Sequence, residues 1–391
     1  MAAPDPVPAN ALERGDFIAD CAPEDLVYFL LNVGDGDSQL LLLPAESNGS
    51  RRALVVDVAT VAKLPSLIEA LAKTPLLPPR DDPFPLVVGT HPHEDHIGGM
   101  PEFLDRFGPL IREYWEPGYY HPSGSYFEVM RALEDHPHIQ HSQPTSGFTR
   151  YLGMVRLTVL APTISLRNRF DSYGVTINNA SIALKVEFPA ARVEQRGSDR
   201  RYLRIRRSQN LVLGADAQTL SWGEVMSDFP ELRPSDSPVA KALRMAVGAD
   251  PLRAQIFKVP HHASKHGVTL ELVELIRPRL SLVSSAPGGG RYNFPHTVAQ
   301  ESVREALEAL ASGAAKHRPD HELGIHYTCT SDTVGAPLGS IAIIVSPSGR
   351  KRLWRLGDRP DAPVDLSQAR RFVEQELAEA SDIETHEPAP A

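Results

Sequence analysis

The sequence predicts an α/β fold, and three observations support this prediction. Apolar runs of strand length alternate with segments of helical spacing through most of the chain. The first three runs, Leu26 to Val33, Gln39 to Leu43 and Ala53 to Val58, predict successive strands joined by polar turns. With 391 residues, the chain is long for one ordinary domain but suits one α/β domain with insertions and a tail.

Further elements follow in the same alternation. Helical spacing is found in residues 62–73, 101–107, 126–135 and 270–276, and strands are expected over residues 182–188, 211–213, 255–259 and 280–284. Closing strands are expected within residues 328–345. Residues 361–380 suggest a docked amphipathic helix, and residues 381–391 a disordered tail.

The composition limits where the protein acts and what it binds. The formal net charge of −9 argues against a broad basic surface, so a nucleic acid would have to bind a local patch. The two cysteines, Cys21 and Cys329, favour a reducing compartment, with a single bridge left open. Residues 1–10 do not resemble a signal peptide, and no apolar run is long enough to cross a bilayer. We therefore expect a cytoplasmic protein with no membrane part.

A dense set of metal-binding side chains follows the apolar run Pro85 to Val88. The segment His91-Pro-His93-Glu-Asp95-His96 places four metal-capable side chains within six positions. Imidazole and carboxylate together suit zinc and similar first-row ions. Because the apolar run predicts a buried strand, the motif should lie on the loop at its carboxyl end, where open α/β sheets bind ligands. A His-rich loop without a ligand is the alternative.

This segment resembles the HxHxDH signature of the metallo-β-lactamase superfamily. The resemblance implies that His91 and His93 bind one metal and that Asp95 and His96 bind a second, with a bridging hydroxide as nucleophile. It implies one or two Zn²⁺ ions, with Mn²⁺ or Fe²⁺ as alternatives. It also implies a four-layer αβ/βα sandwich, in which two mixed sheets pack face to face with helices outside.

Two further segments resemble one branch of that superfamily. Residues 32–38, Asn-Val-Gly-Asp-Gly-Asp-Ser, are similar to the NVGxGDS segment in the hydrolase domain of ComEC-type DNA-uptake proteins. An ordinary hairpin turn with Asp35 and Asp37 in solvent is the alternative. Asp57 ends an apolar run and matches the family aspartate that orients metal ligands, although a helix cap or turn residue would look the same.

The third histidine that most superfamily members use for the first metal is absent. At the corresponding distance the chain carries Asn178, Asn179 and Ser181 before a predicted strand. ComEC-like proteins show an Asn-x-x-Ser pattern here, so the departure supports the subfamily while it weakens the expectation of a fully occupied first site. Asparagine is a poor zinc ligand but a suitable donor to a phosphate or a metal-bound water. These residues are expected to contact the substrate or support the ligands, and an ordinary loop is the alternative.

The remaining ligands are expected after two later strands. Asp216 follows the first of these strands and matches the family aspartate that bridges both metals. The second strand leads to Pro260-His261-His262-Ala263-Ser264-Lys265, which is similar to the PHHGSK element of ComEC-like proteins with alanine in place of glycine. One histidine should complete the second site with Asp95 and His96. We favour His261 and expect His262 and Lys265 beside the ligands or substrate, but the sequence leaves the choice open.

Two more segments are candidates for substrate contacts. Residues 287–296 form a glycine-rich loop, similar to a family Asn-x-x-His-Pro region with its order changed, in which Arg291 is a candidate anion contact and His296 a candidate general acid. Residues 192–207 contain seven arginines and alternate as a strand would. These arginines could contact phosphates, or they could belong to a solvated hairpin that protects a sheet edge.

Together these observations predict a metal-dependent hydrolase, and a phosphodiesterase or nuclease before anything else, with single-stranded DNA or another phosphodiester as substrate. Asp95, His262 and His296 are the candidate catalytic residues. The alternatives are a lactone or ester hydrolase of the same superfamily and a non-catalytic binding module that has lost one metal. The predicted hydrolase domain covers residues 26–356, between an N-terminal extension, 1–25, and a C-terminal helix and tail, 357–391.

Overall fold

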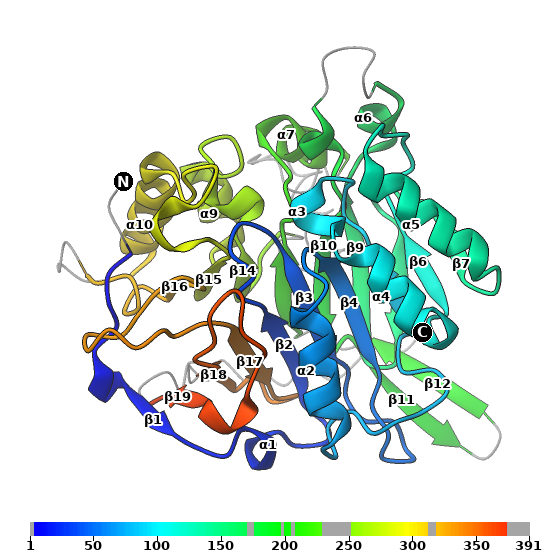
Figure 1. The fold of residues 1–391 in the computed structure, drawn as a ribbon, viewed down its shortest axis with the longest axis horizontal. Helices are drawn as coiled ribbons and strands as arrows, with labels where there is room; N and C mark the ends of the chain where they lie inside the picture. The colour runs from blue at the N-terminus through cyan, green and yellow to red at the C-terminus, as the bar shows by residue number, and fades with distance from the viewer. Residues whose placement is uncertain are drawn as a thin grey trace, which may run out of the picture.

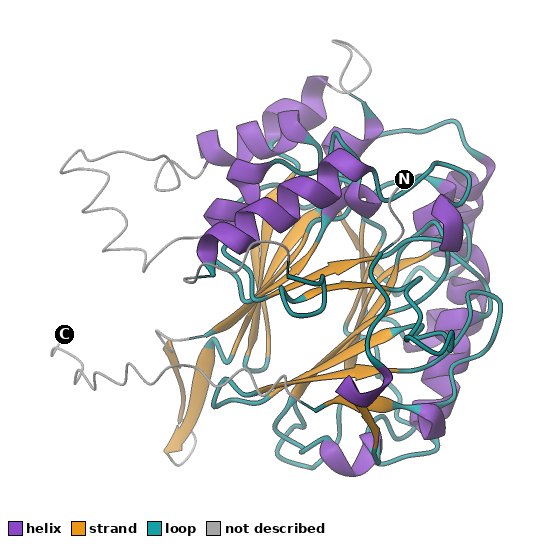
Figure 2. Cartoon of the chain, turned by 90° about the vertical axis from the view of Figure 1, so that its left-hand side faces the viewer, coloured by secondary structure: helices purple, strands orange, loops and turns teal. Residues whose placement is uncertain are grey.

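The computed structural model describes residues 4–169, 176–196, 199–204, 208–228, 252–311 and 318–373. These residues form two large sheets, which pack face to face with helices on their outer sides (Figure 2). The four-layer αβ/βα sandwich is therefore confirmed. A separate two-stranded ribbon, β11 (Ala191–Arg196) with β12 (Asp199–Arg204), extends from the body.

The larger sheet has ten strands. Its centre is mixed, because β17, β2, β3 and β4 pair antiparallel whereas β4, β5, β6 and β7 pair parallel. In spatial order the strands are β1 (Leu12–Arg14), β19 (Arg370–Phe372), β18 (Lys351–Arg355), β17 (Ile341–Val345), β2 (Leu26–Leu30), β3 (Ser38–Leu42), β4 (Ala53–Val58), β5 (Leu86–Val88), β6 (Glu113–Trp115) and β7 (Gln140–Ser142).

The smaller sheet has seven strands and is also mixed. The strands β13, β14, β15 and β16 pair parallel, and β13, β10, β9 and β8 pair antiparallel. In spatial order they are β16 (Ile325–Tyr327), β15 (Leu280–Val283), β14 (Ile256–Lys258), β13 (Gln209–Leu213), β10 (Ala183–Phe188), β9 (Val155–Ala161) and β8 (Thr149–Leu152).

Helices cover the outer face of each sheet. The larger sheet is covered by α2 (Lys63–Ala72), α4 (Met100–Phe107) and α5 (Gly124–Asp135), and the smaller sheet by α7 (Thr219–Asp228), α9 (Leu270–Ile276) and α10 (Thr297–Leu310). Shorter helices are α1 (Phe17–Asp20), α3 (Glu94–Ile97) and α6 (Ile164–Arg169). None of the helices among the described residues is long and apolar enough to cross a membrane.

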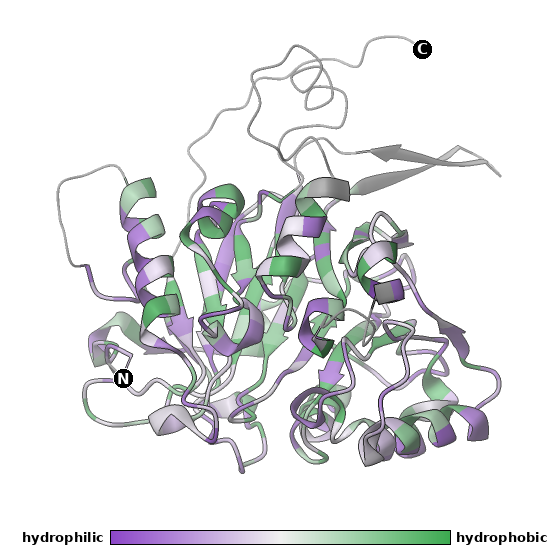
Figure 3. Ribbon diagram, turned by 90° about the horizontal axis from the view of Figure 1, so that it is seen from above, coloured by the Kyte–Doolittle hydropathy of each residue, from purple (hydrophilic) through white to green (hydrophobic). Residues whose placement is uncertain are grey.

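Alternating side chains explain the layers. In β2, Val27 and Phe29 pack with the helices of the larger sheet, whereas Leu26, Tyr28 and Leu30 face the smaller sheet. Successive side chains of a strand point to opposite faces, so a run that is apolar at every position is buried on both sides. Figure 3 shows hydrophobic residues concentrated on the strands between the helical layers.

The parallel strands set the position of the functional residues. The carboxyl ends of β4 and β5 in the larger sheet and of β13 and β14 in the smaller sheet lead to segments that meet at one edge of the sandwich, near α3 and β14 in Figure 1. Ligand sites of open α/β sheets lie at such an edge. Both sheets therefore contribute residues to one site.

The structure corrects the sequence analysis near the C-terminus. A docked helix was expected over residues 361–380, but Arg370–Phe372 forms the strand β19, preceded by a 3₁₀ turn at Leu366–Gln368. The strand β19 pairs with β1, so segments outside residues 26–356 belong to the larger sheet. Strand pairing with a distant segment outweighed the helical spacing, and the tail from residue 374 lies outside the described residues.

Cys21 and Cys329 are free thiols, so the bridge left open by the sequence does not form.

Candidate metal centre

Metal-binding side chains gather at the shared edge in three clusters. Within each cluster the candidate ligand atoms lie within 4.8 Å of one another. The two histidines of the HxH part belong to the first cluster, and the Asp-His part belongs to the second. The third cluster combines His96 with Asp37 and Asp57. The clusters are His91, His93 and Asp216; Asp95, His96 and His262; and Asp37, Asp57 and His96.

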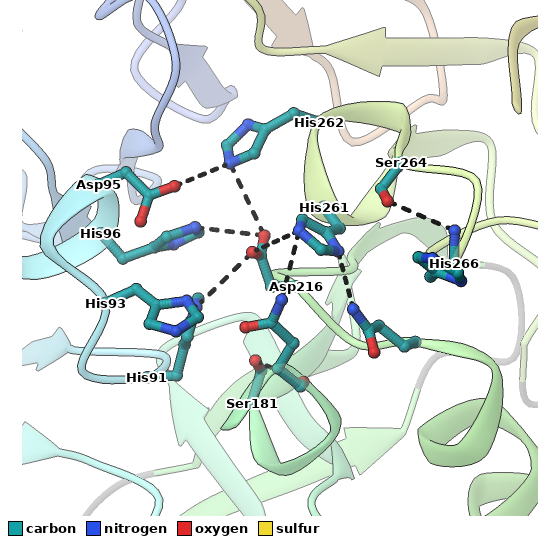
Figure 4. Close-up of polar contacts among 12 residues, drawn as sticks. His91, His93, Asp95, His96, Ser181, Asp216, His261, His262, Ser264 and His266 are labelled. Atoms are coloured by element: carbon teal, nitrogen blue, oxygen red, sulfur yellow. Dashed lines mark hydrogen bonds and ion pairs between the residues drawn. The ribbon is translucent and has the colours of Figure 1, made fainter. Parts of the chain in front are cut away.

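Asp216 lies between the first two clusters, and each of its two carboxylate oxygens lies near two of the histidines (Figure 4). Its Oδ1 lies 3.2 Å from Nε2 of His96 and 3.8 Å from Nε2 of His262. Its Oδ2 lies 3.6 Å from Nε2 of His91 and 3.6 Å from Nε2 of His261. A carboxylate in this position can bridge two cations, one on each side.

The donor set fits divalent cations. Among the described residues, Nε2 of His96, Nε2 of His262 and Oδ1 of Asp216 are buried atoms that make no hydrogen bond, although the first and last lie close together. Leaving such atoms unpaired is costly unless another group binds them. Imidazole and carboxylate ligands in sets of three suit Zn²⁺ and related ions, and these sets leave further coordination positions for substrate or water.

Charges within the centre shift the pKa values of its residues in opposite directions. Burial would raise the pKa of Asp216, but His96 and His261 bring it well below its ordinary value. Burial lowers the pKa of His91 well below the usual range and also lowers that of His93. Burial opposes the charged form of His96, but Asp216 and Asp57 raise its pKa well above the ordinary value. The carboxylates that favour a charged His96 would equally favour a cation in this place.

Asp57 contacts the ring of His96. Its Oδ2 lies 2.7 Å from Nδ1 of His96, while its Oδ1 accepts a hydrogen bond of 2.7 Å from the backbone N–H of Thr90. The hydroxyl of Thr90 also donates to Oδ2 at 2.8 Å. These contacts leave Nε2 of His96 free to face the centre, and hydrogen bonds of this kind orient a metal-binding histidine.

A second support, which the sequence analysis missed, holds His262. Its Nδ1 lies 2.9 Å from Oγ of Ser284, and that hydroxyl donates to Asp37. Asp37 forms a buried ion pair with Lys258. Burial would raise the pKa of Asp37, but Lys258 keeps it below the ordinary value. Lys258 ends β14 and Ser284 directly follows β15, and neither belongs to a recognisable motif, so only their position after folding reveals them.

The structure corrects two interpretations at this point. His261 was favoured as the partner of Asp95 and His96, but the clustered residue is His262, whose Nε2 lies 3.7 Å from Oδ2 of Asp95. The solvated hairpin turn is also wrong for Asp37, which is fully buried, and its backbone N–H donates to the carbonyl of Asp95 at 3.0 Å. The turn therefore docks onto the metal-binding loop.

The turn after β14 has an unusual backbone. His261, His262 and Ala263 have φ values of 50°, 53° and 59°. Side chains with a Cβ rarely occupy this left-handed region, and such strain is common where a site needs a particular geometry. Ala263 thus stands where a glycine would be free of this strain. The turn directs two consecutive histidines toward the two oxygens of Asp216.

The segment that lacks the third histidine lies beside His261. Nδ2 of Asn178 is 3.2 Å from Nε2 of His261, and Asn178 is buried. Asn179 and Ser181 support this segment, because Oδ1 of Asn179 accepts from the backbone N–H of Ser221 and the hydroxyl of Ser181 donates to the carbonyl of Asn178. Only Asn178 of the three has a side chain in contact with a histidine of the centre.

Other predicted substrate contacts lie farther out. Nδ1 of His296 accepts a hydrogen bond of 3.0 Å from the backbone N–H of Lys265, and the ring of Phe294 contacts the rings of both His296 and His261. Arg291 is exposed, and its backbone N–H donates to Asp35. The roles predicted for His296, Lys265 and Arg291 remain predictions. The side chains of residues 192–207 lie outside the described part of the chain.

One comparison, with models of protein families, agrees with this geometry. Residues 49–171 match the model of the metallo-beta-lactamase superfamily, and this stretch contains the HxHxDH segment. No curated protein that was compared matches the chain.

Solved structures give weaker likenesses. The chain is similar to Igni18, a metallo hydrolase from the archaeon Ignicoccus hospitalis, with 13% identity, 75% of this chain and 96% of that chain covered, and a TM-score of 0.37. It is similar to the metallo-beta-lactamase fold protein YhfI from Bacillus subtilis, with 13% identity, coverage of 74% and 94%, and a TM-score of 0.37. For the short form of human tRNase Z the identity is 11%, the coverage 66% and 92%, and the TM-score 0.32. Scores at this level carry no argument about activity. Residues 49–171, which supply His91, His93, Asp95 and His96 to the clusters, are thus similar to the metallo-beta-lactamase superfamily.

Proposed function

We propose that the protein is a metal-dependent hydrolase that cleaves phosphodiesters. The observation that carries this proposal is the position of Asp216, a buried carboxylate with one oxygen toward His96 and His262 and the other toward His91. When bound, a pair of divalent cations stabilises the attacking and leaving oxygens of a displacement and lowers the pKa of bound water. That chemistry suits a phosphodiester better than a neutral substrate.

The residues of the chain hold and orient this centre. His91, His93 and Asp216 would hold one cation, and Asp95, His96 and His262 the other. Asp57 and Ser284 turn the rings of the second set so that Nε2 of each faces the centre. Because both supports are buried, these rings are held in place before a substrate arrives.

An aromatic cluster beside the metal-binding loop favours a substrate that carries a base. The rings of Tyr120, Tyr126 and Phe127 lie 5.8 to 6.2 Å apart, and Tyr120 and Phe127 are 63% and 50% exposed. Ser123, between them in sequence, contacts the carbonyl of Pro92, and His121 packs on His93. Exposed aromatic rings stack on nucleobases. We therefore propose single-stranded DNA or another nucleotide phosphodiester as substrate.

The reaction class is tested with purified protein in zinc and in manganese. We expect cleavage of bis-p-nitrophenyl phosphate that chelation abolishes. Turnover of a lactone or ester with no phosphodiester cleavage would replace the proposal with the corresponding hydrolase. A protein that binds neither metal and cleaves neither substrate would instead be a binding module.

The substrate size is tested by removing the exposed rings. The double change Tyr120→Ala and Phe127→Ala should weaken binding of single-stranded DNA by about 1–3 kcal/mol per stacked base. Turnover of bis-p-nitrophenyl phosphate should remain. Tyr151→Ala, at an exposed ring on β8, is the matched control. Equal DNA binding by all variants would argue for a smaller substrate.

A further inference from the structure

A pocket of about 570 Å³ lies at the end of the sandwich opposite the metal centre. Arg112 and Gln140 stand at the amino ends of β6 and β7 in the larger sheet, and Arg150 lies in β8 of the smaller sheet. His91, by contrast, follows the carboxyl end of β5, which runs parallel to β6. The neighbouring strand β4, with six residues, spans about 20 Å. Among the described residues, none of the candidate metal ligands lines the pocket, so the two sites are separate.

The size and the lining of this pocket suit a small polar ligand. Pockets that bind small molecules usually measure roughly 300–1,000 Å³ and have mostly apolar walls. Here arginine, glutamate, glutamine and threonine side chains make up most of the described lining. A water molecule occupies about 30 Å³ of the liquid, so a lone phosphate ion would fill only a small part of the pocket. A ligand that fills it therefore has a polar body as well as any charged group.

Positive charge predominates in the wall of the pocket. Among the described lining residues, Arg52, Arg112 and Arg150 are cationic and Glu113 is the one carboxylate. The chain as a whole has a formal net charge of −9, so this excess is local. The charged group of a ligand that binds here is therefore an anion.

The ion pairs around Arg112 leave donors for such an anion. Asp82, which does not line the pocket, is paired with three guanidinium groups, those of Arg52, Arg80 and Arg112. Glu46 also pairs with Arg52 and Arg80, so two carboxylates serve three arginines. Arg112 uses only Nη2 in its ion pair, and its side chain is 58% exposed. Its Nε and Nη1 bind no other group among the described residues, so both can donate to a ligand.

Arg150 is held in place from behind. Its Nη2 lies 2.7 Å from Oε2 of Glu113, while its side chain is 43% exposed. Glu113 is buried, and its Oε1 accepts a hydrogen bond of 2.7 Å from the indole N–H of Trp115. The buried carboxylate therefore orients an exposed guanidinium group. Gln140 and Thr149, which are exposed in the same lining, can form hydrogen bonds with hydroxyl groups.

We propose that this pocket binds a phosphorylated sugar, with Arg112 and Arg150 on the phosphate and Gln140 and Thr149 on the hydroxyl groups. The planar guanidinium group binds phosphate oxygens through two parallel hydrogen bonds. A free sugar phosphate and a nucleotide share this chemistry, and the titration below distinguishes them. The inference goes beyond the proposed function, because the pocket lies apart from the metal centre.

The ligand class is tested by calorimetric titration of the zinc-loaded protein. We expect ribose 5-phosphate to bind with one site per chain, inorganic phosphate to bind more weakly, and ribose not to bind. Tighter binding of adenosine 5′-monophosphate would identify the ligand as a nucleotide, and equal or weaker binding would identify it as a free sugar phosphate. If neither phosphorylated compound bound, or if inorganic phosphate bound as tightly, the proposal would fail.

The role of the arginines is tested with Arg112→Gln. This change should weaken binding of ribose 5-phosphate about 10–100-fold, because hydrogen bonds between charged groups are lost. The fold should be retained, because Asp82 keeps its other two arginines. Arg131→Gln, at an exposed arginine of α5, makes the same change in charge and should bind as the wild type does. Equal affinities of the two variants would mean that Arg112 serves only its ion pair, which contradicts the proposal.

A phosphate group can also bind metal ions, so the titration is repeated with Asp216→Ala. The pocket predicts that this variant binds ribose 5-phosphate as tightly as the wild type does. Loss of binding would place the ligand at the metal centre and overturn the proposal. If the wild type cleaves no phosphodiester but ribose 5-phosphate binds and Arg112→Gln weakens it, the proposed function fails while the pocket is supported.

Discussion

The two candidate ion positions differ in how firmly the protein supports them. At the second position, Nδ1 of His96 contacts Asp57 and Nδ1 of His262 contacts Ser284, and both histidines are fully buried. At the first position, His93 is partly exposed, and an asparagine stands where a third histidine is expected. Supporting hydrogen bonds raise the metal affinity of a histidine. We therefore expect the second position to bind its ion more tightly than the first.

The largest effect should come from the residue that the two positions share. Asp216→Ala removes the carboxylate between them, so two cations would repel each other without relief. We expect the loss of both ions and of activity, measured by elemental analysis and by turnover of bis-p-nitrophenyl phosphate. Asp81→Ala, at an exposed carboxylate, should change neither. A variant that kept one ion with full occupancy would show that the two positions are independent.

The next-largest effect should be on stability, and it should come from the buried ion pair of Asp37 and Lys258 behind the second position. Asp37→Asn leaves the ammonium of Lys258 buried without a counter-charge, which should cost about 3–5 kcal/mol in the free energy of unfolding. The double change Asp37→Asn and Lys258→Met should recover much of this loss. Urea unfolding of the metal-free protein measures both. Equal stability of the single and double variants would mean that the unpaired ammonium is not the cause of the loss.

A smaller effect should distinguish the metal affinities of the two ion positions. Ser284→Ala removes the partner of Nδ1 of His262, which should weaken the second ion about 10–100-fold and leave the first unchanged. Zinc titration calorimetry resolves the two events. Ser302→Ala, on the exposed side of α10, is the matched control. If both affinities fell together, the comparison between the positions would be wrong.

The smallest effect is expected at the arginine-rich ribbon. β11 and β12 lie between the carboxyl end of β10 and the amino end of β13, whereas Asp216 follows the other end of β13. The five residues of β13 span about 17 Å. Changing Arg201, Arg204 and Arg206 to glutamine should therefore leave metal content, small-substrate turnover and the salt dependence of DNA binding unchanged. A flatter salt dependence would instead show that the ribbon contacts phosphates.

Part of this protein could be predicted from local sequence. Strands and helices follow from the spacing of apolar residues, and the HxHxDH segment brings four candidate ligands together because they are neighbours in the chain. Asp57 and Asp216 could be found because Asp57 lies near the carboxyl end of one apolar strand and Asp216 shortly follows another, and parallel strands bring their carboxyl ends to the same edge. The fold and most of the candidate ligands were therefore accessible without a structure.

Only the tertiary structure decided how these side chains are oriented. The choice of His262 over His261 depends on a left-handed turn, and both residues look alike in sequence. Asp37 and Ser284 meet across 247 positions, and Asn178 and His261 across 83. No spacing rule relates such residues, because the sheets bring them together by packing. The backbone N–H of Ser221, a group that cannot turn, then makes Oδ1 of Asn179 its acceptor.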